Sequence, residues 1–76
     1  MSISVLKINA FFRHADMSDV EEIQKKIILS ERQNKIFEMY YIKKQDRGFI
    51  ADTLYVSQSV VSEELKSIRE KLLKFL

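Results

Sequence analysis

The chain has 76 residues, of which 46% are hydrophobic and 32% charged, a balance typical of a small soluble domain rather than a disordered chain. It contains no cysteine, which excludes disulfides and thiolate metal sites, and no apolar run approaches the roughly 18 residues that cross a bilayer. We therefore expect a cytoplasmic protein that does not enter the membrane. The net charge is only +2, but residues 25–49 contain seven basic and three acidic side chains, which makes this segment a candidate for contact with nucleic acid.

The N-terminal segment, residues 3–15, fits two periods. Alternating apolar residues near its start would suit a strand, whereas Ile3, Leu6 and Ala10 fit one face of a helix. No second strand candidate is available for pairing, so we predict a helix. Phe11 and Phe12 are adjacent and cannot share one face, so one of them is expected to be exposed or to meet a partner.

Two capping-box patterns follow. Ser18 with Glu21 predicts a helix from about Asp19 to Ile28, and Ser30 with Gln33 predicts another from about Glu31 to Lys43. The apolar residues expected to be buried are Val20, Ile23 and Ile27 in the first helix, with Ile28 as a further candidate, and Ile36, Phe37, Tyr40 and Tyr41 in the second.

A short helix is predicted next, after the polar connection at residues 43–46. Asp46 is a plausible N-cap, and the helical pattern stops at Tyr55-Val56-Ser57. Ser57 is a good N-cap for a further helix, predicted to continue unbroken to Phe75 because no Pro or Gly interrupts it. Its apolar stripe is Val61, Leu65, Ile68, Leu72 and Phe75. Two helices joined by three residues, the second with a polar outer face, indicate a helix-turn-helix.

The order and spacing of these residues resemble region 4 of bacterial sigma factors over residues 29–73. The matching positions are Leu29-Ser30-Glu31-Arg32-Gln33, Phe37, Tyr40-Tyr41, Ile50-Ala51, Leu54, Val56-Ser57, Val61, Leu65 and Arg69-Glu70-Lys71-Leu72. The resemblance implies an all-α domain of four to five helices without a wing, whose last long helix recognises promoter DNA, with no cofactor and no metal. We accordingly divide the chain into an N-terminal helical segment, residues 1–28, and a helix-turn-helix segment, residues 29–76.

This reading predicts a bacterial or phage transcription regulator that binds double-stranded DNA, and it assigns two sets of contacts. The residues expected to contact bases are Gln58, Ser59, Ser62, Glu63 and Lys66, and those expected to contact phosphates are Lys43, Lys44, Arg47 and Arg69.

Two features depart from the sigma pattern. Tyr55 occupies the turn position where glycine is usual, because that residue often has a positive φ, so we expect a slightly opened turn. Glu63 and Glu64 place an acidic pair on the recognition helix, which lowers the expected affinity for phosphates. The acidic pair favours an alternative in which the same fold binds RNA polymerase, another regulator or a nuclease instead of DNA.

We also predict a homodimer, because the corner of the helix-turn-helix covers only the first half of the apolar stripe. The expected interface consists of Leu72, Leu73, Phe75 and Leu76, together with Phe11 and Phe12. Packing of the same apolar terminus under the N-terminal segment of its own chain is equally compatible with the sequence. An enzyme is not expected, because the sequence has no metal-ligand spacing, glycine-rich phosphate loop or nucleophile beside a histidine.

Overall fold

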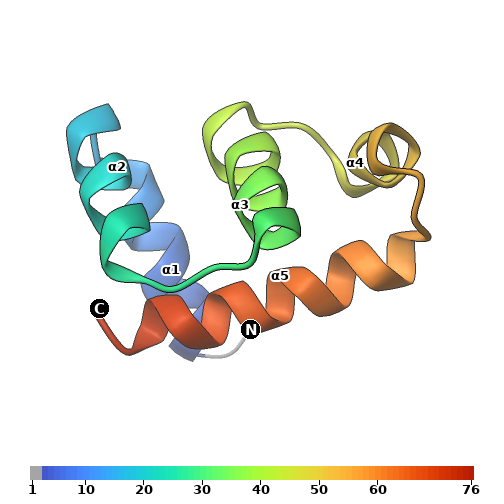
Figure 1. Ribbon diagram of the computed structural model, residues 1–76. Coiled ribbons are helices and arrows are strands. Elements are labelled where there is room, and N and C mark those ends of the chain that lie inside the picture. Colours follow the sequence, from blue (N-terminus) through green and yellow to red (C-terminus); the bar gives the residue numbers. More distant parts are fainter. Residues whose placement is uncertain (1–2) are drawn as a thin grey trace. The chain divides into compact units, whose positions relative to one another are not determined.

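The computed structural model describes residues 3–76, and side chains from residue 5 onward. Over this range the chain is all-α and contains no strand, which confirms the predicted fold class (Figure 1). The elements are α1 (Ile3–His14), α2 (Met17–Lys26), α3 (Glu31–Phe37), a π-helical turn η1 (Glu38–Ile42), α4 (Arg47–Leu54) and α5 (Gln58–Leu73). None of the helices in the described range combines the length and the apolar character that a bilayer crossing requires.

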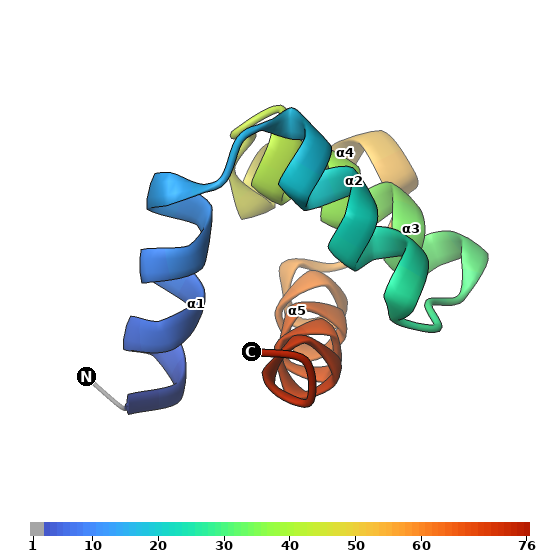
Figure 2. The same ribbon diagram turned by 90° about the vertical axis from the view of Figure 1, so that its left-hand side faces the viewer.

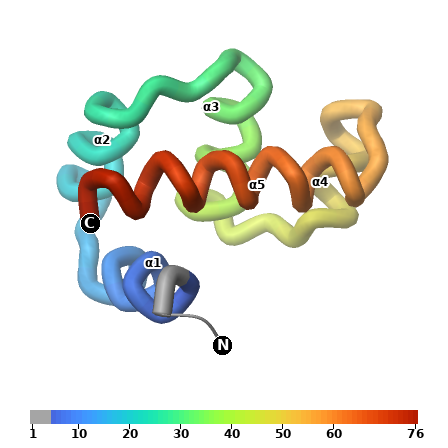
Figure 3. The backbone as a smooth tube through the Cα atoms, turned by 90° about the horizontal axis from the view of Figure 1, so that it is seen from below, coloured from blue at the N-terminus to red at the C-terminus, as the bar shows by residue number. Residues whose placement is uncertain are grey.

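The chain forms two compact units, which are considered separately. Unit 1 consists of Met1–Ile28 together with Arg69–Leu76, and unit 2 consists of Leu29–Ile68. Helix α5 is continuous and contributes to both units, as its uninterrupted course in Figure 3 shows. It ends at Leu73, two residues before the predicted end, and the amides of Lys74 and Phe75 then close tighter turns on the carbonyls of Lys71 and Leu72.

In unit 1, α1 is a helix as predicted, but its buried face was assigned wrongly. Ile8 is fully buried, whereas Leu6 and Ala10 are exposed. Phe11 and Phe12 are both half-buried, and their rings meet edge to face at 5.0 Å. The true face contains Ile8 with the half-buried Val5 and Phe12 and is two positions out of phase with the predicted one, which places it on the opposite side of the helix. The prediction failed because the apolar residues of this segment fit two helical stripes.

Helix α2 follows α1 after a two-residue connection, visible in Figure 2, and its N-cap is Asp16 rather than the predicted Ser18. The Asp16 carboxylate accepts a hydrogen bond from the Asp19 amide (2.9 Å), and the Asp19 carboxylate accepts one from the Asp16 amide (3.2 Å). The capping box therefore begins two residues earlier than expected and gives the first amides of the helix acceptors. Burial is confirmed for Val20, Ile23 and the C-cap Ile27. The further candidate, Ile28, is 88% exposed, because the helix ends at Lys26 and Ile28 lies beyond its C-cap.

In unit 2, α3 begins with the predicted capping box. Ser30 Oγ accepts from the Gln33 amide (3.1 Å), and Gln33 Oε1 accepts from the Ser30 amide (3.2 Å). The helix then continues into η1 rather than remaining an α-helix to Lys43, and the Lys43 amide donates to the Glu38 carbonyl (2.9 Å). The extra residue in this turn brings Met39 and Tyr41 into the core and leaves Tyr40 half-buried.

The core of unit 2 is formed by apolar side chains from α3, η1, α4 and α5. The apolar stripe of α5 is confirmed for Val61, Leu65 and Ile68, each fully buried. The remaining buried apolar side chains of unit 2 are Ile36, Phe37, Met39, Tyr41, Ile50 and Ala51. With its apolar stripe used in the core, α5 leaves its polar face available for contacts.

Candidate nucleic-acid interface

The corner between α4 and α5 is a tight turn of three residues, shown in Figure 1 where the two helices meet. Tyr55 has left-handed backbone angles, φ 57° and ψ 42°. The Val56 amide donates to the Ala51 carbonyl (3.0 Å) and the Tyr55 amide to the Asp52 carbonyl (3.4 Å). These two bonds form a Schellman motif, which normally has glycine at the left-handed position. The predicted opening of the turn is therefore wrong: the ordinary turn is kept, with a tyrosine in the strained position.

Both helices of the corner carry the predicted N-caps. The Asp46 carboxylate accepts from the Phe49 amide (2.8 Å), and Ser57 Oγ accepts from the Val60 amide (3.2 Å). The start of α5 also lies close to the start of α4: a Cβ added to Gly48 would stand 3.4 Å from Gln58 Nε2 and 3.3 Å from Asp46 Oδ1. The lack of a side chain at Gly48 thus gives the Gln58 amide room beside the first turn of α4.

The residues proposed to contact bases lie in the first three turns of α5, within unit 2. Four of them are exposed and Ser62 is half-buried; the exposed ones are Gln58, Ser59, Glu63 and Lys66. Because they alternate with the buried stripe, they form a continuous polar face next to the corner. We call this set the α5 polar face.

The two acidic residues of α5, Glu63 and Glu64, have different surroundings. Glu64 accepts a hydrogen bond from Arg32 Nε on α3 (3.1 Å), and only 19% of its side chain is exposed. Glu63 is exposed on the α5 polar face. One of the two carboxylates that argued against contact with phosphate is therefore paired with a cation inside the unit.

The basic residues predicted to contact phosphates belong to different parts of the chain. Lys43, Lys44 and Arg47 are exposed in the connection to α4 and its first residue, whereas Arg69 is half-buried and belongs to unit 1. Lys44 has a positive φ of 59°. The Arg47 guanidinium lies over the Tyr40 ring, 5.9 Å from its centre, so a residue of η1 holds this cation by a cation–π contact.

A buried glutamine joins α3 to α5. Gln33 Nε2 donates to Ser67 Oγ (3.2 Å), while Gln33 Oε1 serves the capping box of its own helix. Gln33 is a buried polar residue in a core that is otherwise apolar. The Gln33 side chain thus uses both its oxygen and its nitrogen, and its bond to Ser67 fixes the position of α5 against α3.

Two exposed aromatic residues at the corner were not predicted as part of the site. The Tyr55 side chain is 94% exposed and that of Phe49 is 51% exposed. The sequence analysis assigned Phe49 to the apolar pattern of its helix and discussed Tyr55 only for its backbone conformation. A signal was present for Tyr55, because it lies in the connection between two helices, and connecting segments run over the surface.

The residues expected at a dimer interface have different surroundings. Leu72 is fully buried within a single chain and so offers no surface to a second copy, which corrects its assignment. Leu73 is half-buried, and Phe75 and Leu76 are partly exposed after the end of α5. The alternative of intramolecular packing therefore holds for Leu72.

We compared the chain with protein-family models, curated proteins and solved structures, and no match was found. Its function has to be argued from the residues of the chain itself.

Proposed function

We propose that the chain is a sequence-specific DNA-binding transcription regulator of the cytoplasm, in which α4 and α5 act as a helix-turn-helix similar to that of sigma region 4. The observation that carries the proposal is the three-residue Schellman turn, which precedes a capped helix with one buried and one polar face. In helix-turn-helix proteins this arrangement lets the second helix enter the major groove while the first crosses the DNA backbone.

The chemistry of the α5 polar face supports base contacts. An amide, two hydroxyls, a carboxylate and an ammonium group are presented by Gln58, Ser59, Ser62, Glu63 and Lys66. A Gln side chain can pair with adenine, a Lys with guanine and a Glu with the cytosine amino group. The face thus offers donors and acceptors for several bases of one half-site.

Electrostatics at the start of α4 supports phosphate contacts. Lys43, Lys44 and Arg47 are exposed there, beside the N-terminus of α4, where the helix dipole favours an anion; the Asp46 carboxylate already accepts from one amide of the first turn, that of Phe49. The pairing of Glu64 with Arg32 removes one opposing carboxylate. Phosphate contacts at this position would fix the register of α5 in the groove.

Selection from a pool of random DNA duplexes, followed by mobility-shift titration, tests the proposal. We expect one enriched motif, and we expect the double variant Lys44→Glu, Arg47→Glu to lose binding to it. The matched control is Lys7→Glu, Arg13→Glu, which makes the same change of charge at exposed positions of unit 1, outside the basic segment, and should retain binding. Unchanged binding by the first double variant would overturn the assignment.

A second candidate function is a protein-interaction module that binds RNA polymerase, another regulator or a nuclease. The observation that favours it is the exposure of Phe49 and Tyr55, because aromatic residues are enriched at protein interfaces. Phe49→Ala distinguishes the two candidates. If the chain binds DNA, Phe49→Ala should have the same affinity for the selected motif as the unmodified chain. If it binds a protein instead, no motif should be enriched, and a partner that co-purifies with the unmodified chain should be lost from Phe49→Ala.

A further inference from the structure

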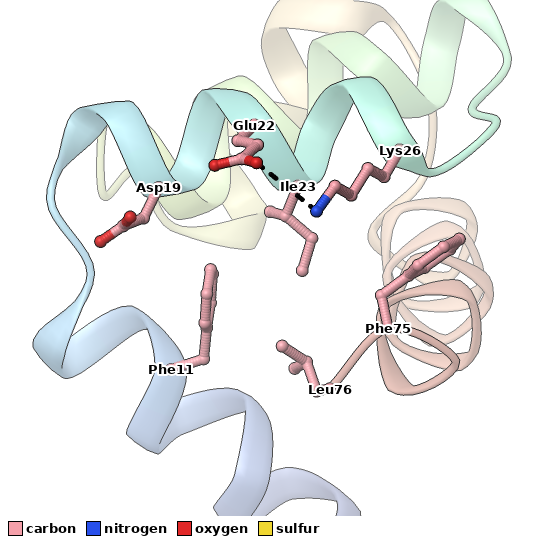
Figure 4. Close-up of a pocket in the computed structure, with 7 residues that line it drawn as sticks. All are labelled: Phe11, Asp19, Glu22, Ile23, Lys26, Phe75 and Leu76. Atoms are coloured by element: carbon pink, nitrogen blue, oxygen red, sulfur yellow. Dashed lines mark ion pairs between the residues drawn. The ribbon is translucent and has the colours of Figure 1, made fainter.

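Unit 1 contains two neighbouring hollows that share the side chains of Lys26 and Phe75. The first, of about 200 Å³, lies among α1, α2 and the residues after α5, with Phe11, Ile23 and Leu76 in its wall (Figure 4). The second, of about 240 Å³, lies between the end of α2 and the end of α5. We call the second one the lysine groove; it is lined by Lys26, Ile27, Ile28, Lys71, Lys74 and Phe75.

The lysine groove has an apolar floor that the chain itself leaves uncovered. Ile28, directly after the end of α2, is 88% exposed, and Phe75 is 52% exposed. Burying large apolar side chains such as these is favourable relative to leaving them in water. Two large apolar side chains beside one hollow form a surface that a partner could cover.

The shape of the groove is fixed by a bond across it. Lys71 Nζ, on the last turn of α5, donates to the carbonyl of Ile28 over 2.7 Å. This bond gives a donor to the Ile28 carbonyl, which follows the end of α2, and it links the two walls of the groove. The lysine groove is therefore a preformed feature of unit 1.

The charge of the groove has one sign. Its charged side chains are Lys26, Lys71 and Lys74, and no carboxylate is among the described residues that line it. Lys26 is partly compensated by Glu22 at 3.5 Å in the neighbouring hollow, as the dashed line in Figure 4 shows. Lys74 is exposed and makes no ion pair with any residue that the structure describes. Three ammonium groups around an apolar floor give a positive potential that negative groups would complement.

We propose that the lysine groove binds an acidic, apolar peptide segment of a partner protein. The floor of Ile27, Ile28 and Phe75 would cover its leucine or phenylalanine side chains, and the three lysines would pair with its carboxylates. A second copy of this chain fits less well, because two-fold pairing of the groove would bring the same lysines together. A DNA duplex fits less well, because its backbone would leave Ile28 and Phe75 without apolar contact. The proposal concerns unit 1 and does not rest on DNA binding by unit 2.

The probe for the test is a short fluorescein-labelled peptide in which Leu and Phe alternate with Asp and Glu. Fluorescence anisotropy with the full chain should show saturable binding that weakens as salt is added, since exposed charges contribute to it. A peptide with Lys in place of Asp and Glu should not bind, and neither should one with Ser in place of Leu and Phe. Binding of either control peptide as tightly as the acidic apolar one would overturn the proposal.

Two variants at exposed positions locate the binding without endangering the fold. Ile28→Ser and Lys74→Glu should each lower the affinity for the acidic apolar peptide about tenfold, as expected for side chains central to an interface. Lys25→Glu is the matched control, because Lys25 is exposed on the same helix α2 and does not line the groove. The proposal is overturned if Lys25→Glu lowers the affinity for the peptide as much as Lys74→Glu does, because binding would then reflect net charge alone.

Other occupants of the groove are distinguished in the same samples. Vesicles of acidic phospholipid that bind and compete with the peptide would assign the groove to a membrane surface and overturn the proposal. Self-association that Ile28→Ser abolishes would assign it to a second copy, with the same consequence. Absence of both, together with peptide binding, supports a protein partner.

Discussion

Arg32 Nε and Glu64 Oε2 lie 3.1 Å apart, although 32 positions separate the two residues in the chain. The pair joins the first turn of α3 to the middle of α5 and holds one carboxylate away from the α5 polar face. The contact has two separable effects, one on stability and one on the charge that approaching DNA would meet.

Breaking this pair should affect DNA binding more than stability. A double-mutant cycle with Arg32→Leu and Glu64→Gln should give a coupling of only about 0.2–1 kcal/mol in urea unfolding, because half of the Arg32 side chain is exposed. Arg32→Leu alone should weaken binding to the selected duplex by leaving the Glu64 charge unpaired, and adding Glu64→Gln should restore it. Equal DNA affinities for Arg32→Leu, Glu64→Gln and the double variant would show that the charge of Glu64 does not influence DNA binding.

Gln33→Ala should destabilise the chain more than Ser67→Ala. The glutamine serves both the capping box and the bond to α5, so its loss breaks two interactions at a buried position and should cost about 2–3 kcal/mol. Ser67→Ala removes only one bond and should cost about 1 kcal/mol. Thermal unfolding followed by circular dichroism measures both, and equal losses would contradict the double role of Gln33.

Glycine at either left-handed position should stabilise the fold. Tyr55 and Lys44 have φ of 57° and 59°, so Tyr55→Gly and Lys44→Gly should each raise the free energy of unfolding by up to about 1 kcal/mol. DNA affinity should fall in Lys44→Gly, which loses a phosphate contact, and stay unchanged in Tyr55→Gly. Loss of stability in Tyr55→Gly would mean that the exposed ring makes contacts that outweigh the strain.

Lys66 and Lys44 should differ in how they affect DNA binding. Lys66→Ala should cost about 1–3 kcal/mol on the selected duplex and change the selected sequence, because Lys66 is assigned to a base. Lys44→Ala should weaken all duplexes alike and lower the slope of log affinity against log salt by about 1, because one phosphate contact is lost. Salt titrations on the selected and a scrambled duplex measure both effects. Identical behaviour of the two variants would refute the division into base and phosphate contacts.

The apolar terminus should respond differently at its two ends. Leu72→Glu places a charge at a fully buried position and should cost about 4 kcal/mol or more, whereas Phe75→Glu, at a half-exposed position, should stay within about 1 kcal/mol. Because lysines surround Phe75, we expect the unmodified chain to sediment as a monomer of 9.0 kDa. A heavier species that Phe75→Glu reduces to 9.0 kDa would instead support the homodimer predicted from the sequence.

The parts of this fold that could be predicted were those with local signals. The caps at Ser30, Asp46 and Ser57 each place a polar side chain before an apolar period, and the structure contains all three. The cap of α2 was misplaced because Asp16 with Asp19 and Ser18 with Glu21 are overlapping capping boxes, and the pattern alone does not choose between them. The earlier box adds two residues to the helix while leaving Val20 and Ile23 on the buried face.

The parts that could not be predicted depend on tertiary contacts. Neither Arg32 with Glu64 nor Gln33 with Ser67 has a signature in the sequence, because each pair is more than 30 positions apart. The sequence therefore named candidate residues on α5 but did not show that Glu64 is paired with Arg32. The lysine groove was missed for a related reason, since it joins Ile28 to residues 71–75 across most of the chain.

The π-helical turn at Glu38–Ile42 has a consequence for comparing this chain with others. A π turn holds one residue more than an α-helical turn, so it absorbs a single-residue insertion while the helix on either side keeps its face. A relative that lacks one residue here could form a plain α-helix and still present the same corner. When such a relative is aligned with this chain, its sequence should show a one-residue gap between Glu38 and Ile42. Without that gap, every residue after the turn would be aligned with a residue one position away from its true counterpart.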